Sequence, residues 1–282
     1  MNLYDYNTIN KILTAHGFTF SKALGQNFLI DPSVCPEMAS QLKADRDTGV
    51  IEIGPGIGVL TKELCKVAGK VIAIELDKRL FPVLGETLGE FSNLEIVEGD
   101  VLELDLAALI EEKFSDKKSV KVCANLPYYI TSPVIMKLLE SKLPIDEIVV
   151  MVQKEAAERF CAKIGSRESG AVTVAVNYYA EAEMLFEVTK ECFYPSPKID
   201  SAVMRLTLRN QPPVEVQDEN RFFAVVKAAF AQRRKTALNS LSSSLGLPKE
   251  KVLSALNEIA ADEKVRAESF SIEQLARLSE IL

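Results

Sequence analysis

The first half of the chain alternates short apolar runs with longer segments in which apolar residues recur at helical spacing. The apolar runs predict five β-strands, near residues 49–53, 70–74, 94–97, 120–124 and 147–152. Helical segments separate these strands, and a first helix is expected at Asn7–Ala15, ended by Gly17. Strands that alternate with helices are typical of parallel sheets with right-handed crossovers. The pattern therefore predicts an α/β fold with a Rossmann-like, mostly parallel sheet.

The pattern changes after residue 150. Three segments read as strands without long helices between them, and we expect them to end the sheet in a hairpin-like arrangement: Val172–Tyr178, Ala182–Val188 and Ser201–Leu208. Gln211-Pro212-Pro213 then interrupts the pattern, and three helices are expected after it: Asn220–Asn239, Lys249–Ala261 and Ile272–Leu282. This predicts two domains, a sheet domain at residues 1–210 and a smaller all-α domain at residues 211–282.

Small and acidic residues follow three of the predicted strands. A glycine-rich turn at Gly54-Pro55-Gly56-Ile57-Gly58 lets the backbone turn sharply and approach a ligand closely. Glu75 and Asp100 come at the ends of the next two strands, and ligands of open α/β sheets bind at the carboxyl ends of strands. An acid about twenty residues after such a turn can accept both ribose hydroxyls, so Glu75 is the ribose candidate. Asp100 suits the amino group of an adenine. Either acid alone is more commonly a solvated loop carboxylate.

The tetrapeptide Asn125-Leu126-Pro127-Tyr128 follows the fourth strand and suits a flat amine. The Asn125 carboxamide oxygen can accept a hydrogen bond from an exocyclic amino group, and Pro127 fixes the backbone so that the Leu126 carbonyl can accept another. Tyr128 offers a ring for stacking. An ordinary turn with a surface tyrosine could use the same residues, but with the glycine turn and the two acids the tetrapeptide predicts a nucleobase pocket.

These motifs resemble, in their order, those of S-adenosylmethionine-dependent methyltransferases, and among them the ribosomal RNA adenine N6-dimethyltransferase family in its small-subunit branch. The resemblance covers most of residues 16–240 and is carried by these stretches: Lys22–Leu29, the turn at Gly54, Glu75–Asp77, Gly99-Asp100, Asn125–Tyr129, Gln153–Glu155 with Glu158-Arg159, Phe193–Lys198 with Ser201–Val203, and Phe230 with Arg233–Thr236. It implies methyl transfer from S-adenosylmethionine to the N6 amines of two adjacent adenosines in a hairpin loop near the 3′ end of 16S rRNA, within the small ribosomal subunit.

The resemblance also implies roles for individual residues. The cofactor-binding residues are Asn27, the Leu29 backbone, Gly54, Gly56, Glu75, Asp100 and Asn125, and the catalytic set is Asn125, Leu126, Pro127, Tyr128 and Phe193. Asn125 and Leu126 would accept both hydrogens of the target amine and draw its nitrogen toward tetrahedral geometry, so that no strong base is needed. Tyr128 and Phe193 would stack on the flipped-out base. For Phe193, a buried core position is the alternative.

The net charge of −7 and pI near 5.1 are unusual for a protein that binds nucleic acid. A local basic cluster, Arg233-Arg234-Lys235, closes a predicted helical stretch and is available to RNA phosphates. Lys22 could extend this basic surface. The alternative for the cluster is that its cations only complement a helix C-terminus. We expect the sheet domain to bind the cofactor and catalyse, and the helical domain to bind RNA.

Composition excludes several other kinds of site. The five cysteines are scattered without Cys-x-x-Cys spacing, and His16 is the only histidine. Histidine-based triads and paired-histidine metal sites are therefore excluded, and we expect no metal. The N-terminus lacks the features of a signal peptide, and no run of about eighteen apolar residues occurs, so we expect a cytoplasmic protein without a membrane span. A monomer is expected.

Three other functions are compatible with parts of the sequence. The nearest is the macrolide-resistance relative that methylates large-subunit rRNA, and another is a non-catalytic ribosome-assembly or transcription factor on the same fold. An NAD-dependent oxidoreductase is disfavoured by Val59 in place of a third glycine and by the lack of a Tyr-x-x-x-Lys set. The stretches 164–170 and 237–239 depart from the family pattern, so the RNA-docking surface is expected to differ from that of relatives.

Overall fold

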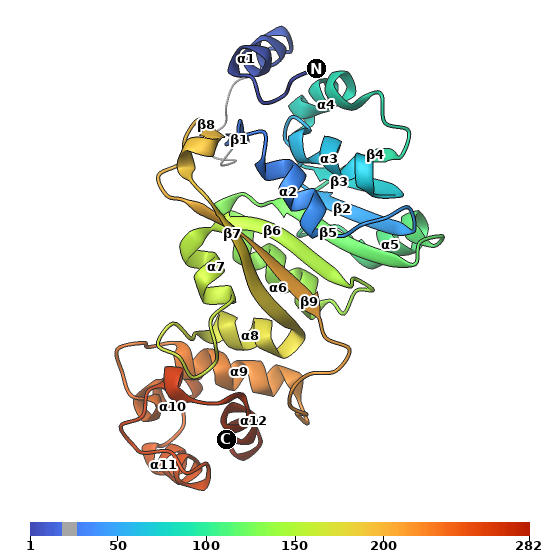
Figure 1. Cartoon of the computed structure of the whole chain (residues 1–282). Coiled ribbons are helices and arrows are strands. Elements are labelled where there is room, and N and C mark those ends of the chain that lie inside the picture. Colours follow the sequence, from blue (N-terminus) through green and yellow to red (C-terminus); the bar gives the residue numbers. More distant parts are fainter. Residues whose placement is uncertain (19–26) are drawn as a thin grey trace. The chain divides into compact units, whose positions relative to one another are not determined.

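The computed structural model describes residues 1–18 and 27–282 (Figure 1). Its main element is a seven-stranded sheet in the order β4-β3-β2-β5-β6-β9-β7. The strands of this sheet are β2 (Thr48–Ile53), β3 (Lys70–Glu75), β4 (Leu94–Glu98), β5 (Ser119–Asn125), β6 (Glu147–Gln153), β7 (Ala180–Val188) and β9 (Ser201–Leu208). A second sheet pairs β1 (Phe28–Leu29) with β8 (Phe193–Tyr194) in antiparallel register.

The five strands predicted in the first half of the chain are all present and run parallel to their neighbours in the order β4-β3-β2-β5-β6. Strand β9 is antiparallel to β6. The central strands β2, β3 and β6 are buried along most of their length and mainly apolar, because helices cover both faces of the sheet (Figure 1). The prediction of a Rossmann-like, mostly parallel sheet is confirmed.

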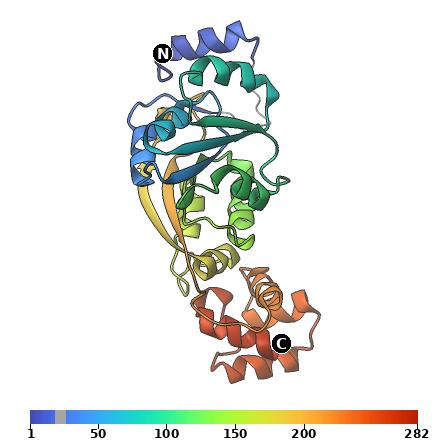
Figure 2. The ribbon, with the colours of Figure 1, turned by 90° about the vertical axis from the view of Figure 1, so that its right-hand side faces the viewer.

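Seven helices accompany the first six strands in the described part of the chain. They are α1 (Tyr6–Ala15), α2 (Val34–Gln41), α3 (Val59–Val67), α4 (Phe81–Leu88), α5 (Leu106–Phe114), α6 (Thr131–Glu140) and α7 (Lys154–Phe160). Figure 2 shows α1 alongside α4, and the His16 Nε2 atom lies 2.8 Å from Glu86 Oε2 between these two helices. His16 therefore makes a surface contact that joins the two helices.

The chain forms two compact units. The sheet unit comprises Met1–Ala157 and Glu183–Leu208, and the helical unit comprises Glu158–Ala182 and Arg209–Leu282. Five helices lie in the helical unit: α8 (Ala171–Tyr179), α9 (Glu219–Phe230), α10 (Ala237–Leu245), α11 (Lys249–Glu258) and α12 (Ile272–Ile281). Its core is formed by apolar side chains from all five helices.

The predicted strand at Val172–Tyr178 was wrong, because this segment forms helix α8. Its β-branched and aromatic residues favour a strand locally. The Thr173 hydroxyl accepts a hydrogen bond from the Gly170 N–H at 3.0 Å and donates to the Arg159 carbonyl at 2.8 Å, which fixes the start of the helix. The Tyr178 ring packs on Phe222 of α9 with 5.3 Å between ring centroids. Capping and tertiary packing therefore override the local preference of this segment.

The single helix predicted at Asn220–Asn239 was also wrong, because two helices, α9 and α10, occupy this range with a turn between them. Thr236 caps the second helix, since its hydroxyl accepts from the Asn239 N–H at 3.4 Å. The buried Ser240 hydroxyl donates to the Ala228 carbonyl at 2.7 Å and holds α10 against the end of α9. Helical spacing continues across the turn, so the apolar pattern alone did not reveal the break.

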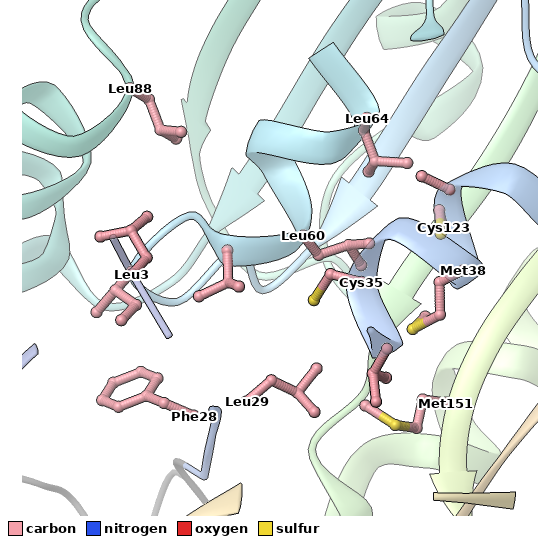
Figure 3. Packing of buried hydrophobic residues seen from close by; sticks show 14 of the residues in the cluster. Leu3, Phe28, Leu29, Cys35, Met38, Leu60, Leu64, Leu88, Cys123 and Met151 are labelled. Atoms are coloured by element: carbon pink, nitrogen blue, oxygen red, sulfur yellow. The ribbon is translucent and has the colours of Figure 1, made fainter. Parts of the chain in front are cut away.

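The apolar core of the sheet unit includes residues of the β1–β8 pair and of the glycine turn. Figure 3 shows side chains from β1, α2, α3, α4, β5 and β6 in this core, and its labelled residues are Leu3, Phe28, Leu29, Cys35, Met38, Leu60, Leu64, Leu88, Cys123 and Met151. Cys35 and Cys123 are free and fully buried. Burial raises the pKa of both thiols, which are therefore neutral core side chains.

Substitution of two glycines of the sheet unit by alanine is expected to change the stability of the protein in opposite directions. A Cβ at Gly49 in β2 would lie 2.3 Å from the Phe114 ring of α5, whereas a Cβ at Gly85 in α4 would meet nothing within 4 Å. We expect Gly49→Ala to destabilise the protein by at least about 1–3 kcal/mol through overpacking. Gly85→Ala should stabilise it by about 0.5–1 kcal/mol, since alanine favours a helix. Thermal unfolding of both variants measures this. Equal melting temperatures would contradict the packing of α5 on β2.

Candidate active site

One pocket collects all the residues that the sequence assigned to catalysis and to cofactor binding. It lies at the carboxyl ends of the parallel strands, within the sheet unit, and these residues line it: Asn27, Leu29, Gly54, Gly56, Glu75, Asp100, Asn125, Leu126, Pro127, Tyr128 and Phe193. They come from segments far apart in the sequence. The parallel register places the ends of β2, β3, β4 and β5 at the same edge of the sheet, which explains why these segments meet.

The glycine turn between β2 and α3 forms one wall of the pocket. Gly54 and Gly56 have φ values of 70° and 60°, which side chains other than glycine rarely adopt. A Cβ at Gly54 would meet nothing within 4 Å, so open space lies before it, and a Cβ at Gly56 would lie 3.3 Å from the Phe28 ring. The turn is held by the Gly54 N–H, which donates to the Ile74 carbonyl at 2.9 Å. Bare backbone at this wall suits the close approach of a ligand.

Two acids at the ends of the next two strands line the same pocket. Glu75 ends β3 and is 6% exposed, and its Oε1 atom accepts from the Asp77 N–H at 2.7 Å. Burial raises the pKa of Glu75. Asp100 follows β4, and its Oδ1 atom accepts from the Leu102 N–H at 2.8 Å. Each carboxylate offers about four acceptor positions, so both retain capacity for hydroxyl or amino donors of a ligand.

Asn125 and Leu126 present acceptors at the end of β5. The Leu126 N–H donates to the Met151 carbonyl at 3.1 Å, and the Pro127 carbonyl accepts from the Ile130 N–H at 3.1 Å as the chain turns into the short helix η3 (Tyr128–Ile130). Among residues 1–18 and 27–282, neither the Asn125 carboxamide nor the Leu126 carbonyl has a hydrogen-bond partner. Two fixed acceptors are therefore available to the two hydrogens of an amine.

The aromatic residues Tyr128 and Phe193 lie far apart in the sequence but line the same pocket. The Tyr128 hydroxyl lies 2.8 Å from Ser201 Oγ, and burial raises the pKa of this phenol. Phe193 is 3% exposed and lies in β8, where it pairs with Leu29 of β1. The Ile30 N–H also donates to the Cys192 carbonyl at 2.8 Å. Phe193 is thus both a core residue and a wall of the pocket.

Glu52 and Tyr129 are two of the pocket residues that the sequence did not assign to the site. Glu52 is 1% exposed, and its Oε2 atom has no hydrogen-bond partner in the described structure. Burial raises the pKa of Glu52 to about 8, and the charge of Glu75 adds to the shift. An acid within the apolar run Val50–Ile53 was the available signal for it. Tyr129 also lines the pocket and is 55% exposed.

The basic cluster lies in the helical unit, in the turn between α9 and α10, rather than at the end of a helix as predicted. Arg233, Arg234 and Lys235 are all exposed, and an Arg233 Nη2 atom donates to the Arg167 carbonyl at 3.3 Å. None of the three forms an ion pair with a carboxylate in the part of the chain that the structure describes. The predicted RNA-binding residue Lys22 falls outside the described residues.

Within the described ranges, no group of three or more His, Cys, Asp or Glu side chains is arranged to hold a metal ion. The helices of the same ranges are all too short or too polar to cross a membrane. The described lining of the pocket consists of backbone, carboxyl groups, amides, aromatic rings, aliphatic side chains and the Cys35 thiol.

A family model described as ribosomal RNA adenine dimethylase matches residues 17–282. Ribosomal RNA small subunit methyltransferase A of Bacillus licheniformis is 50% identical over 275 residues, which are 96% of this chain and 94% of that protein. The protein of the same name from Geobacillus thermodenitrificans is 49% identical over the same shares of both chains. The similarity therefore extends over nearly the full length.

Two solved structures have a fold similar to that of this chain. A dimethyladenosine transferase from Plasmodium falciparum superposes with a TM-score of 0.72 at 26% identity, over 89% of this chain and 95% of that one. The 23S rRNA methyltransferase ErmE superposes with a TM-score of 0.67 at 29% identity, over 90% of this chain and 99% of that one.

The buried Glu52 predicts a specific pH dependence of stability. Its pKa is about 8 in the folded protein and near 4.5 when unfolded, so the unfolded state alone loses the proton as pH rises between these values. The wild type should therefore lose stability relative to Glu52→Gln across this window, by up to about 1.4 kcal/mol per pH unit. Chemical unfolding at several pH values without cofactor measures the difference. Glu111→Gln, at an exposed site on α5, is the matched control. If the difference in the free energy of unfolding between the wild type and Glu52→Gln does not change with pH, the burial of this carboxyl is contradicted.

Proposed function

This chain belongs to the ribosomal RNA adenine dimethylase family, as an S-adenosylmethionine-dependent methyltransferase of small-subunit rRNA, and we propose that it dimethylates the N6 amines of two adjacent adenosines. The proposed target is a hairpin loop near the 3′ end of 16S rRNA. The observation that carries this proposal is the pair of unpartnered acceptors, Asn125 and Leu126, in a pocket that also holds the glycine turn and two strand-end acids. Two acceptors fit the two hydrogens of an adenine amino group.

The residues of the pocket fit S-adenosylmethionine. Gly54 and Gly56 leave backbone exposed to the ligand, Glu75 accepts from ribose hydroxyls, and Asp100 accepts from the adenine amino group. Asn27 and the Leu29 backbone lie at the methionine end. When bound, the cofactor supplies an activated methyl group on a sulfonium. The described lining of the pocket includes the strand-end acids Glu75 and Asp100 and no Lys, Arg or His, which favours a cationic ligand.

The acceptors of the tetrapeptide orient the target nitrogen. The adenine N6 lone pair is delocalised into the ring, and hydrogen bonds to the Asn125 oxygen and Leu126 carbonyl draw the nitrogen toward tetrahedral geometry. Both oxygens also stabilise the positive charge that develops on N6 during transfer. The Asn125 position is fixed because the next residue donates to the Met151 carbonyl. The N6 proton then leaves to solvent, so no side-chain base is required.

Tyr128 and Phe193 hold the flipped-out base. Stacking on an aromatic side chain contributes about 1–3 kcal/mol per base and does not depend on base identity. The hydrogen bond between the Tyr128 and Ser201 hydroxyls limits rotation of the Tyr128 ring, and the pairing of β8 with β1 limits movement of Phe193. The two rings are thus ordered before the base arrives, which reduces the entropy cost of binding.

The exposed cluster of Arg233, Arg234 and Lys235 binds rRNA phosphates. Lys235 directly precedes Thr236, the N-cap of α10, where the helix dipole disfavours a cation. Helix capping therefore does not account for Lys235, and exposure without carboxylate partners among the described residues supports phosphate contacts by the cluster. In this proposal residues 1–210 bind the cofactor and catalyse, residues 211–282 bind RNA, and Lys22 adds a contact.

The proposed partner is 16S rRNA within the small ribosomal subunit, in the cytoplasm. A monomer suffices, because a single chain supplies every proposed pocket residue. The large-subunit alternative is less favoured, since the 23S rRNA methyltransferase ErmE is 29% identical and the small-subunit enzymes are 49–50% identical. A non-catalytic role is less favoured, because it does not explain why the Asn125 carboxamide and the Leu126 carbonyl face the pocket without hydrogen-bond partners among the described residues.

Asn125→Ala tests the chemistry. Without the side-chain acceptor, we expect single-turnover methyl transfer to fall by about 100- to 1,000-fold, the range for loss of one oxygen or nitrogen that stabilises developing charge. Small-subunit binding should stay near wild type. Asn257→Ala, at an exposed position on α11, is the matched control. A variant Asn125→Ala that transfers methyl groups at the wild-type rate would refute the mechanism.

Replacing Arg233, Arg234 and Lys235 together by Ala tests the RNA surface. Each lost phosphate contact should reduce the slope of log affinity against log salt by about one, while S-adenosylmethionine affinity stays unchanged. A triple Ala variant at Lys249, Lys264 and Arg266 is the control with the same change of charge. Small-subunit binding over a salt series measures both slopes. If the two triple variants have the same slope as the wild type, the basic cluster does not bind RNA phosphates.

A further inference from the structure

Two consecutive tyrosines in η3 have different surroundings. Tyr128 makes its hydrogen bond to Ser201 on β9, and Asp200 is the nearby charge that acts on its phenol. Tyr129 makes no hydrogen bond in the described part of the chain and is 55% exposed, yet it lines the pocket. Burial raises the pKa of Tyr129, and the charges of Asp100 and Glu75 raise it further. The two phenols thus have different neighbours, because Ser201 and Asp200 near Tyr128 do not line the pocket, whereas Glu75 and Asp100 near Tyr129 do.

The strand order indicates where Tyr129 extends. Tyr129 follows β5, whereas Glu75 ends β3 and Asp100 follows β4, and the sheet order is β4-β3-β2-β5. To lie near both acids, the phenol must reach past the end of β2, which is where the glycine turn lies. Tyr129 therefore extends over the part of the pocket formed by the glycine turn and the two acids.

The exposure of Tyr129 fits a ligand that covers it. The large apolar side chains that are exposed in the described chain are Met1, Tyr6, Leu76, Tyr129 and Ile199. Leu76 and Tyr129 line this pocket, and the other three do not. An aromatic ring beside an open nucleoside site gains stacking energy when a purine nucleoside fills that site.

We propose that Tyr129 is a second tyrosine of the site with a separate role from Tyr128, and that it covers the nucleoside portion of S-adenosylmethionine. Tyr128 stacks on the target base, and Tyr129 positions the cofactor next to Glu75 and Asp100. This inference depends on the proposed cofactor site. It predicts that cofactor affinity depends on the Tyr129 ring through the nucleoside and not through the methionine end.

Calorimetric titration of the full chain with two ligands tests the inference. S-adenosylmethionine contains both ends of the cofactor, and 5′-methylthioadenosine contains the nucleoside without the amino acid. Tyr129→Ala should raise the Kd of both ligands by the same factor, about 5- to 20-fold. Tyr129→Phe keeps the ring and should stay within about twofold of wild type. Tyr6→Ala, an exposed tyrosine outside the pocket, should leave both Kd values unchanged.

Other results would overturn the inference. An unchanged Kd for 5′-methylthioadenosine in Tyr129→Ala would place the ring away from the nucleoside. A loss in Tyr129→Phe as large as in Tyr129→Ala would exclude stacking. Weaker small-subunit binding with unchanged cofactor affinity would assign Tyr129 to RNA instead. Thermal unfolding of each variant shows that it is folded, and Glu75→Ala serves as the positive control. Failure of the wild type to bind S-adenosylmethionine would instead refute the proposed cofactor site itself.

Discussion

The common edge of the parallel strands is the constraint on which the site depends. In a parallel sheet every strand ends on the same side, and the register between β2, β3, β4 and β5 brings their last residues level. The glycine turn, Glu75, Asp100 and Asn125 each come directly after one of these ends or complete it. Their side chains can therefore act on one ligand although up to seventy-one positions separate Gly54 from Asn125. Of these strands, β2 and β3 are buried along nearly their whole length, so the ends that carry the glycine turn and Glu75 are held by the packed core.

The β1–β8 pair completes the pocket from the other side. It places Leu29 opposite Phe193, and the Phe28 ring packs close to Gly56 of the glycine turn. The core in Figure 3 supports this pair through α2 and α3. One small antiparallel sheet thus joins two residues of the pocket wall, Leu29 and Phe193, that come from distant parts of the sequence.

The chemistry of the site follows from what these elements present. The pocket offers acceptors and carboxylates, and it contains no histidine, since the single histidine lies at the end of α1. Buried acids such as Glu52 and Glu75 carry raised pKa values because water is excluded. A cationic ligand stabilises the ionised form of an acid beside it, so the ionised acids of the pocket favour a sulfonium cofactor. Such a site suits methyl transfer to an amine that the protein only has to orient, because this reaction needs no side-chain base.

The sequence by itself determined the parallel sheet and the order of the motifs, because strand periodicity, glycine turns and strand-end acids are local signals. It also identified all eleven catalytic and cofactor candidates that line the pocket. Only the tertiary structure decided α8, where packing of Tyr178 on Phe222 overrides β-branched residues, and the turn that exposes Arg233–Lys235. The tertiary structure also decided that Glu52 and Tyr129 line the pocket. Neither an acid within an apolar strand nor a tyrosine next to another tyrosine indicates this in the sequence, because the pocket forms only where distant strands meet. Burial and proximity depend on contacts between remote segments, which no local pattern encodes.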